Sequence, residues 1–188
     1  MPGDKFVVGL AGMPGAGKSV VVQVAKESGY GVVVMGDVVR EETERRCLEY
    51  TPENLGKIML ELRRSEGETV VAKRCIQKIE KAKEPKVIVD GVRSLSEVEE
   101  FKKRFLKFSF MAIHSSPETR FKRLYHRRRS DDPENWEVFR ERDMRELSVG
   151  LGEAIALAEY IIVNDEELEV VKEKIRKILR KVEEKWMK

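Results

Sequence analysis

Cysteine is scarce in this sequence of 188 residues, which contains only Cys47 and Cys75 and no C-x-x-C pair. Two isolated thiols are too few for a disulfide framework or a cysteine-built zinc site, and they fit a reducing compartment. Long hydrophobic runs are also absent, so no segment has the roughly 20 apolar residues that a membrane-spanning helix requires. The N-terminus lacks the apolar core of a signal peptide. These absences predict a cytoplasmic protein that does not enter a membrane.

The sequence also has no large excess of one charge, because 37 basic and 34 acidic residues leave a net charge of only +3. Such a balance excludes a general binder of polyanions, so nucleic acid is not the expected partner. A chain of this length with 41% hydrophobic residues can bury a sizeable core. We therefore expect one domain, residues 1–188, that is a monomer or a small homo-oligomer.

The most informative segment matches the phosphate-loop pattern G-x-x-x-x-G-K-[ST], with apolar residues 6–11 before it and 20–22 after it. Glycine lets the backbone turn its N–H groups towards a polyphosphate, and the following helix start attracts the same anion. Lys18 supplies a charge for the β- and γ-phosphates, and the Ser19 hydroxyl is suited to Mg²⁺. The motif predicts binding of ATP and Mg²⁺ by these residues: Gly12, Met13, Pro14, Gly15, Ala16, Gly17, Lys18 and Ser19.

The rest of the chain alternates short Val-rich runs with segments of helical periodicity. Strands are predicted at residues 5–10, 32–35, 86–90, 108–113 and 160–163. Helices are predicted at 18–27 and 38–48, from Thr51-Pro52, after Gly67, from a capping box of Ser96 with Glu99, from Ser116-Pro117, from Asp132-Pro133 and from about residue 166. Buried strands that alternate with helices predict an α/β fold with a parallel sheet covered on both faces. Ligands of such sheets bind at the carboxyl ends of the strands.

Charged residues follow the second and third predicted strands. Three roles fit Asp37: a base for an acceptor hydroxyl, part of the metal shell, or a helix N-cap. Arg40, three positions on, has a planar guanidinium suited to phosphate. Asp90 ends the third strand, where P-loop proteins place an acid that reaches Mg²⁺, although a capped turn is the alternative. Arg93 supplies a second phosphate ligand.

A basic segment, residues 120–129, holds six Lys or Arg and no acid. On a helix, Arg120, Arg123 and Arg127 share one face. One interpretation is a lid whose arginines neutralise charge on a transferring phosphate. The alternatives are an RNA-binding patch and a solvated basic face that ends in a turn at Ser130-Asp131-Asp132. His114 and His126 are expected to be bystanders, because phosphoryl transfer needs no histidine.

Together, residues 12–19, Gly36-Asp37-x-x-Arg40, Asp90-Gly91-x-Arg93 and the basic helix resemble the nucleotide-kinase branch of P-loop proteins. Within that branch the chain is similar, over nearly its whole length, to the archaeal adenylate-kinase-related, dephospho-CoA-kinase-like group. The resemblance implies a three-layer P-loop NTPase fold with strand order 2-3-1-4-5. It also implies an acceptor-binding helical region at about 37–84 and a short Arg-rich lid at about 118–147.

The resemblance also implies roles for single residues. Arg40 resembles the ligand of an acceptor phosphate in adenylate kinases, and Arg93 resembles the arginine after their Asp-Gly, at a spacing one residue shorter. Asp37 resembles the base of dephospho-CoA kinases. Arg123 and Arg127 have the spacing of their lid arginines, and residues 158–164 resemble their segment ending in asparagine. A cysteine-built lid is absent, and the adenine-reading residues of adenylate kinases have no counterpart that we can place.

The sequence thus predicts an ATP- and Mg²⁺-dependent kinase that phosphorylates a small nucleotide-like acceptor, such as a nucleoside monophosphate, a nucleoside or dephospho-CoA. In this hypothesis Lys18, Asp37, Arg123 and Arg127 are catalytic, Ser19 and Asp90 serve the metal, and Asp37, Arg40 and Arg93 bind the acceptor. Two alternatives remain open: a nucleotide-binding regulator or slow NTPase without an acceptor, and an RNA-associated NTPase.

Overall fold

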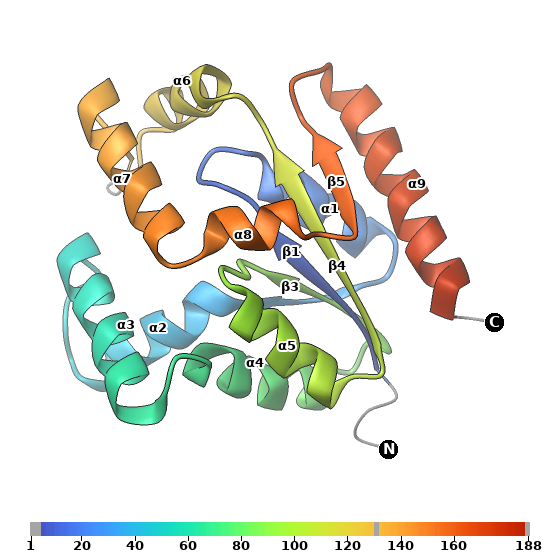
Figure 1. Cartoon of the computed structure of the whole chain (residues 1–188), viewed down its shortest axis with the longest axis horizontal. Coiled ribbons are helices and arrows are strands. Elements are labelled where there is room, and N and C mark those ends of the chain that lie inside the picture. The colour runs from blue at the N-terminus through green and yellow to red at the C-terminus, as the bar shows by residue number, and fades with distance from the viewer. Residues whose placement is uncertain (1–4, 130–131, 187–188) are drawn as a thin grey trace.

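The computed structural model of the chain describes residues 5–129 and 132–186. These residues form a parallel sheet of five strands in the order β2-β3-β1-β4-β5. The first strand of the chain is therefore central, and the last lies at one edge (Figure 1). The predicted order 2-3-1-4-5 is confirmed.

The bounds of the strands are β1 Phe6–Ala11, β2 Gly31–Val34, β3 Lys86–Asp90, β4 Lys107–His114 and β5 Tyr160–Val163. The bounds of the helices are α1 Lys18–Glu27, α2 Met35–Arg45, α3 Pro52–Glu66, α4 Val70–Lys81, α5 Leu95–Arg104, α6 Pro117–Arg127, α7 Trp136–Ser148, α8 Leu151–Ala156 and α9 Leu168–Trp186. The predicted strands lie within one or two residues of these bounds.

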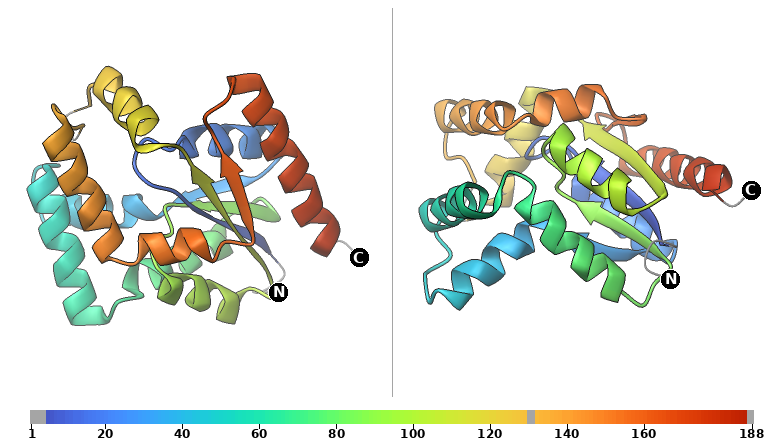
Figure 2. Two further views of the ribbon diagram at one scale, coloured as in Figure 1. Left: turned by 45° about the horizontal axis from the view of Figure 1, so that its top comes forward. Right: turned by 60° about the horizontal axis from the view of Figure 1, so that its bottom comes forward.

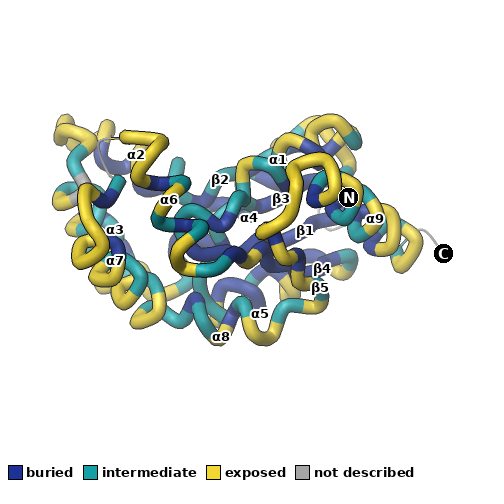
Figure 3. The backbone as a smooth tube through the Cα atoms, turned by 90° about the horizontal axis from the view of Figure 1, so that it is seen from above, coloured by how far each residue is buried: buried dark blue, intermediate teal, exposed yellow. Residues whose placement is uncertain are grey.

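Both faces of the sheet are covered, as its continuous apolar strands require. On one face, the apolar sides of α1 and α9 pack against β1, β3, β4 and β5. On the other, α4, α5 and α8 form a larger core that extends to α2 and α3. The helices and the sheet thus make three layers (Figure 2), with the strands buried between them (Figure 3). The predicted three-layer fold is confirmed.

Three helix starts differ from the prediction. Helix α2 spans Met35–Arg45, so both of its ends lie three residues before the predicted bounds 38–48. Helix α5 begins after Ser94, whose hydroxyl accepts a hydrogen bond from the Glu97 N–H at 3.3 Å, so the expected capping box of Ser96 and Glu99 is wrong. Helix α7 begins after Asn135, not at Asp132-Pro133. Helix α8 is not predicted at all. The other predicted caps are confirmed, because Thr51 caps α3 and Ser116 caps α6.

The elements that matter for the site lie beyond the carboxyl ends of the strands. Helix α2 follows β2 without a break, and α6 follows β4 closely. Helices α3 and α7 stand at the same end of the molecule (Figures 1 and 2). This end of the sheet is where a parallel α/β protein binds its ligands.

Candidate functional site

The phosphate-loop motif, residues 12–19, forms the predicted connection between β1 and α1. Gly15 and Gly17 have φ angles of +80° and +102°, in the left-handed region that favours glycine. Helix α1 begins at Lys18 with no side-chain cap and no acidic residue in its first turn. Its first N–H groups are therefore available to an anion, and the helix dipole favours one there.

The carbonyl side of this loop is held by side chains from distant parts of the chain. The Pro14 oxygen accepts a hydrogen bond from Arg120 Nη1 at 3.2 Å, and the Gly15 oxygen accepts one from Arg123 Nη1 at 3.4 Å. The Ala16 oxygen accepts hydrogen bonds from Asn164 Nδ2 at 2.8 Å and from Ser115 Oγ at 3.3 Å. We call Ser115, Arg120, Arg123 and Asn164 the loop clamp. Because the C=O and N–H of a peptide unit point in opposite directions, holding the carbonyls outward directs the N–H groups inward.

The loop clamp also explains two of the glycines. A Cβ on Gly15 would lie 2.7 Å from the Arg120 backbone oxygen, and one on Gly17 would lie 2.0 Å from Asn164 Nδ2. Both distances are too short for any side chain. The absence of a side chain at Gly15 and Gly17 therefore leaves room for Arg120 and Asn164 of the loop clamp.

Lys18 is held inside the loop. Its Nζ donates a hydrogen bond to the Gly12 oxygen at 2.6 Å and a longer one to the Met13 oxygen at 3.5 Å. Burial lowers the pKa of Lys18, while the charge of Asp90 raises it. A partly desolvated ammonium whose present partners are neutral carbonyls will interact strongly with an arriving phosphate.

Asp90 ends β3 beside Leu10 of β1, as predicted. Its Oδ1 is buried and has no hydrogen-bond partner among the described residues. Burial raises the pKa of Asp90, and the Lys18 charge opposes that shift. An unsatisfied buried carboxylate oxygen is costly unless a cation or its water completes the site.

The donor set at this position fits Mg²⁺. The described residues contain no group of three or more His, Cys, Asp or Glu that would hold a metal by themselves. Mg²⁺ needs no such group, because it keeps several waters and takes one or two protein oxygens plus phosphate oxygens. Asp90 and the exposed hydroxyl of Ser19 would supply the protein oxygens.

Asp37 and Arg40 lie in the first turns of α2 and form an ion pair with each other. The residue at the N-cap of α2 is Val34, so the interpretation of Asp37 as an N-cap is wrong. The two side chains are about half exposed, at 47% for Asp37 and 54% for Arg40. Both charges act on Asp90, because Asp37 raises its pKa and Arg40 lowers it. Because Val34 at the end of β2 pairs with Asp90 in the sheet, the residues predicted after β2 and β3 lie at the same end of the sheet.

Arg93 lies in the loop that leaves β3. Its guanidinium is 3.5 Å from Glu146 of α7, and its charge also lowers the pKa of Lys18. The loop is fixed by Glu97, whose Oε2 accepts a hydrogen bond from the Arg93 N–H at 2.8 Å. Burial raises the pKa of Glu97, and Arg63 lies 3.5 Å from its other oxygen. A buried carboxylate thus positions Arg93 near the phosphate loop.

The three arginines of the basic helix have different surroundings. Arg120 is only 3% exposed and Arg123 is half-buried, and both contact the carbonyl side of the loop. Arg127 is exposed and binds Asp132 with hydrogen bonds of 2.9 and 2.6 Å. Of the predicted turn at 130–132, Ser130 and Asp131 lie outside the described residues. Closure of Arg123 and Arg127 over a triphosphate stays a prediction.

Several residues of the site are not predicted from the sequence. Arg142 and Glu146 of α7 both act on the Lys18 charge, in opposite directions. Asp143 binds Arg120. Ser115 follows β4, so the rule that functional residues follow strands could have found it. Asn164 ends the segment 158–164 noted in the sequence, but its contact with the phosphate loop is not predicted. The residues of α7 carry no such local signal.

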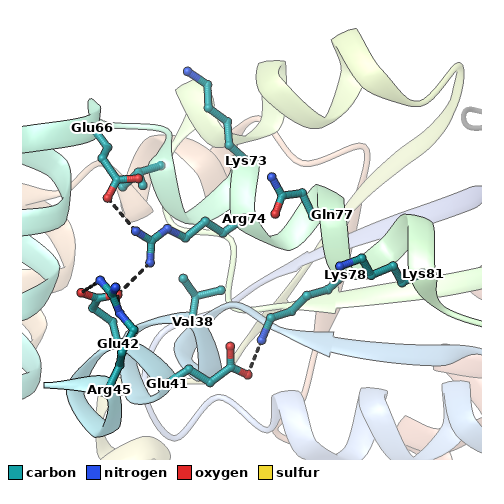
Figure 4. A pocket seen from close by; sticks show the side chains of 11 residues that line it. Val38, Glu41, Glu42, Arg45, Glu66, Lys73, Arg74, Gln77, Lys78 and Lys81 are labelled. Carbon is teal, nitrogen blue, oxygen red and sulfur yellow. Dashed lines mark hydrogen bonds and ion pairs between the residues drawn. The ribbon is translucent and has the colours of Figure 1, made fainter. Parts of the chain in front are cut away.

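A separate groove of about 600 Å³ lies between α2 and α4. Figure 4 shows its ion pairs: Glu42 and Glu66 bind Arg74, Glu42 binds Arg45, and Glu41 binds Lys78. Glu42 is buried, and hydrogen bonds from three arginines, led by Arg45, lower its pKa to about 2. Asp37 and Arg40 do not line this groove. Its ion pairs join α2 to α4, and no residue of the phosphate loop lines it.

Comparison with known structures supports this fold. The shikimate kinase from Bacteroides thetaiotaomicron superimposes with a TM-score of 0.59 at 16% identity, covering 93% of this chain and 98% of that one. Together with the phosphate-loop motif, this likeness shows that the chain has the P-loop fold found in kinases. No helix in the described part of the chain is long and apolar enough to cross a membrane.

Sequence comparison identifies the family. The UPF0200 protein of Hyperthermus butylicus is 47% identical over 178 residues, which is 95% of each chain. The UPF0200 protein of Methanocaldococcus jannaschii is 47% identical over 179 residues, covering 94% of this chain and 90% of that one. A family model described as an AAA domain matches residues 11–140. The chain belongs to the UPF0200 family, and residues 11–140 belong to the AAA domain family.

Proposed function

We propose that this protein is a Mg²⁺-dependent kinase that transfers the γ-phosphate of ATP to a small nucleotide-like acceptor. The observation that carries the proposal is the meeting of three features at one end of the sheet. These are the buried Lys18 inside the phosphate loop, the unsatisfied oxygen of Asp90 beside it, and the pair Asp37–Arg40 facing the same end. A protein that only binds a nucleotide has no need of the third feature.

The loop and Lys18 would hold the donor. The inward N–H groups of residues 12–19 would bind the phosphates, and Lys18 would exchange its bonds to Gly12 and Met13 for bonds to the β- and γ-oxygens. Bound Mg²⁺, held by Ser19 and through water by Asp90, would offset the negative charge of the triphosphate.

The acceptor would lie opposite, within the region formed by residues 37–84. Arg40 and Arg93 would bind its anionic group, each exchanging its present carboxylate partner for it. Asp37 would orient an acceptor hydroxyl and take its proton. Residues 118–147 would form the lid of the same domain. In that lid, Arg127 would leave Asp132 for the transferring phosphate, while Arg123 would support the loop.

The two alternatives are less well supported. A surface for RNA needs exposed cations. The basic segment keeps four of its six exposed, but Arg120 and Arg123 contact the loop carbonyls instead. A regulator without an acceptor leaves the pair Asp37–Arg40 without a use. The similar structure from Bacteroides thetaiotaomicron is also a kinase named for a small acceptor, shikimate.

The test is an assay of ADP release with dephospho-CoA, nucleoside monophosphates and nucleosides offered in turn. We expect one acceptor class to stimulate release, and Lys18→Ala to abolish it, because the ammonium holds the transferring phosphate. Lys26→Ala is the matched control, since Lys26 is exposed on the same helix. Arg40→Ala should raise the KM of the acceptor far more than that of ATP. No stimulation by any acceptor, or unchanged turnover in Lys18→Ala, would contradict the proposal.

A further inference from the structure

Helix α7 turns one face towards the phosphate loop. Phe139, Arg142, Asp143 and Glu146 lie on this face, at the i, i+3, i+4, i+7 spacing of a helical stripe. Phe139 is buried, and the Arg120 guanidinium lies 4.9 Å from its ring centroid. The stripe is therefore docked against α6, whose Arg120 also contacts the loop.

One guanidinium joins α7 to the loop. Arg120 donates two hydrogen bonds to the Asp143 carboxylate, at 2.8 Å from Nη1 and 2.5 Å from Nη2. The same Nη1 donates to the Pro14 oxygen, and Nε donates to the Ser115 oxygen at 3.3 Å. A bidentate pair at a buried arginine is strong and directional. The position of Asp143 is thus tied to the position of the Pro14 carbonyl.

The orientation of the Pro14 carbonyl is linked to that of the neighbouring Gly15 N–H, which belongs to the phosphate loop. The Pro14 C=O and the Gly15 N–H belong to one peptide unit, which is planar and rotates as a whole. A phosphate that draws the Gly15 N–H towards itself must therefore turn the Pro14 oxygen that Arg120 holds. Any such rotation would be transmitted to Asp143 through the Arg120 side chain, which binds both groups.

The other end of the stripe faces the reacting groups. Glu146, one turn beyond Arg142, contacts Arg93, and both Arg142 and Glu146 act on the charge of Lys18. A shift of α7 would move these charges together relative to Lys18. The placement of α7 therefore contributes to the electrostatics around Lys18, after the larger effects of burial, Asp90 and Arg93.

We propose that Arg120 and Asp143 are positioning residues that couple nucleotide binding in the phosphate loop to the placement of α7. The inference rests on the proposed function, because nucleotide phosphates must fill the loop. It assigns Arg120 a task that differs from direct contact with the triphosphate: Arg120 senses the loop from its carbonyl side. The coupling is reciprocal, so docking of α7 also favours the phosphate-binding form of the loop.

Trp136 makes the coupling measurable. It begins α7, and its ring lies 5.1 Å from that of Phe139 and 5.3 Å from that of Phe121. The chain has two tryptophans, so Trp186→Phe leaves Trp136 as the only one. In this background, MgADP and a non-hydrolysable ATP analogue should change the Trp136 emission. Calorimetry on the same samples measures nucleotide affinity independently.

Asp143→Asn should separate the two measurements. We expect its nucleotide affinity to fall by about five- to tenfold, the lower end of what loss of a typical allosteric coupling predicts, while the Trp136 response is lost. Glu141→Gln is the matched control, because Glu141 is an exposed acid on the same helix. Arg120→Lys keeps the charge but cannot bridge both Asp143 oxygens and Pro14, so it should lose the response as well. Circular dichroism verifies that each variant is folded. If Asp143→Asn does not fold, Arg120→Lys provides the test of the coupling.

The outcomes are distinguishable. A Trp136 response that persists in the folded variants, or that is absent in the parent despite nucleotide binding, overturns the coupling and leaves the proposed function intact. Absence of nucleotide binding to the parent in calorimetry overturns both. Loss of the response together with retained nucleotide binding supports the coupling.

Discussion

The contact between Gly17 and Asn164 leads to a prediction that local sequence reasoning would not make. Gly17→Ala places a Cβ 2.0 Å from Asn164 Nδ2 and forces alanine to a φ of +102°. The left-handed backbone costs about 1–2 kcal/mol. Displacing the Asn164 amide, which donates to Ala16, leaves a buried polar group unpaired and costs about 1–3 kcal/mol more. We therefore expect a loss of about 2–5 kcal/mol in the free energy of unfolding.

Gly29→Ala is the matched control for this experiment. Gly29 has a φ of +81°, but no atom lies within 4 Å of the position that a Cβ would take there, so the variant bears the backbone strain alone. Urea unfolding should place Gly17→Ala below Gly29→Ala in stability by at least about 1 kcal/mol. Adding Asn164→Ala to Gly17→Ala removes the clash, so the two changes should cost less together than the sum of their separate effects.

A different result would refute this reasoning. If Gly17 served only to admit a phosphate, Gly17→Ala would weaken ATP binding yet lose no more stability than Gly29→Ala. Strictly additive effects of Gly17→Ala and Asn164→Ala would lead to the same conclusion. Either result would mean that the loop does not depend on Asn164 for its shape.

Two further predictions concern buried carboxylates. Because burial raises the pKa of Asp90 above its ordinary value of 3.8, the folded state takes up the proton more readily than the unfolded chain, and stability falls as pH rises through that window. In Asp90→Asn, the free energy of unfolding measured in urea should no longer fall as the pH rises above 3.8. The same variant should lose the extra thermal stability that Mg²⁺ gives beyond ATP alone. If the variant keeps this Mg²⁺ effect, Asp90 is not part of the metal shell. For Glu42 the pH dependence of stability is reversed, because hydrogen bonds from arginines lower its pKa from 4.5 to about 2. The ionised Glu42 therefore stabilises the fold above pH 4.5, and this stabilisation is lost as the pH falls towards 2. Glu42→Gln should cost about 1–3 kcal/mol at neutral pH and little near pH 2, whereas Glu99→Gln, which breaks an exposed pair with Lys102, should cost under about 0.5 kcal/mol at either pH.

Local patterns were sufficient for much of the fold. The strand–loop–helix connection at residues 12–19, the five apolar strands and the caps at Thr51 and Ser116 all depend on neighbours in the sequence, and all are confirmed. The strand order followed from resemblance to a known class. Asp37, Arg40, Asp90 and Arg93 were found because each follows a strand, and the structure brings them to one end of the sheet.

The errors arose where distant residues decide between equivalent local signals. Both Ser94-x-x-Glu97 and Ser96-x-x-Glu99 fit a capping box, and the structure uses the first because Glu97 is buried against Arg93 and Arg63. Asp132 is a plausible cap by sequence, but its carboxylate binds Arg127, so Asn135 caps α7 instead.

The basic helix is a further case in which distant residues decide the outcome. Its helical spacing predicted three arginines on one face, yet no local signal indicates that Arg120 is buried or that its partner is Asp143. Likewise, the stripe on α7 has an ordinary helical spacing that many surface helices share. Such roles depend on which element the helix meets, and that information lies outside the segment.

The loop clamp has a consequence for how the protein folds. The hydrogen bond from Asn164 to Ala16 joins residues 148 positions apart, and that from Arg120 to Pro14 joins residues 106 apart. Contacts of such long sequence separation bear the entropy of chain closure before they contribute stability, so they form late. The ribosome makes the phosphate loop well before it makes β5, but the loop acquires its shape only after β5 has added to the sheet. A nascent chain therefore contains the whole phosphate-loop motif long before the residues that hold its carbonyls have been made.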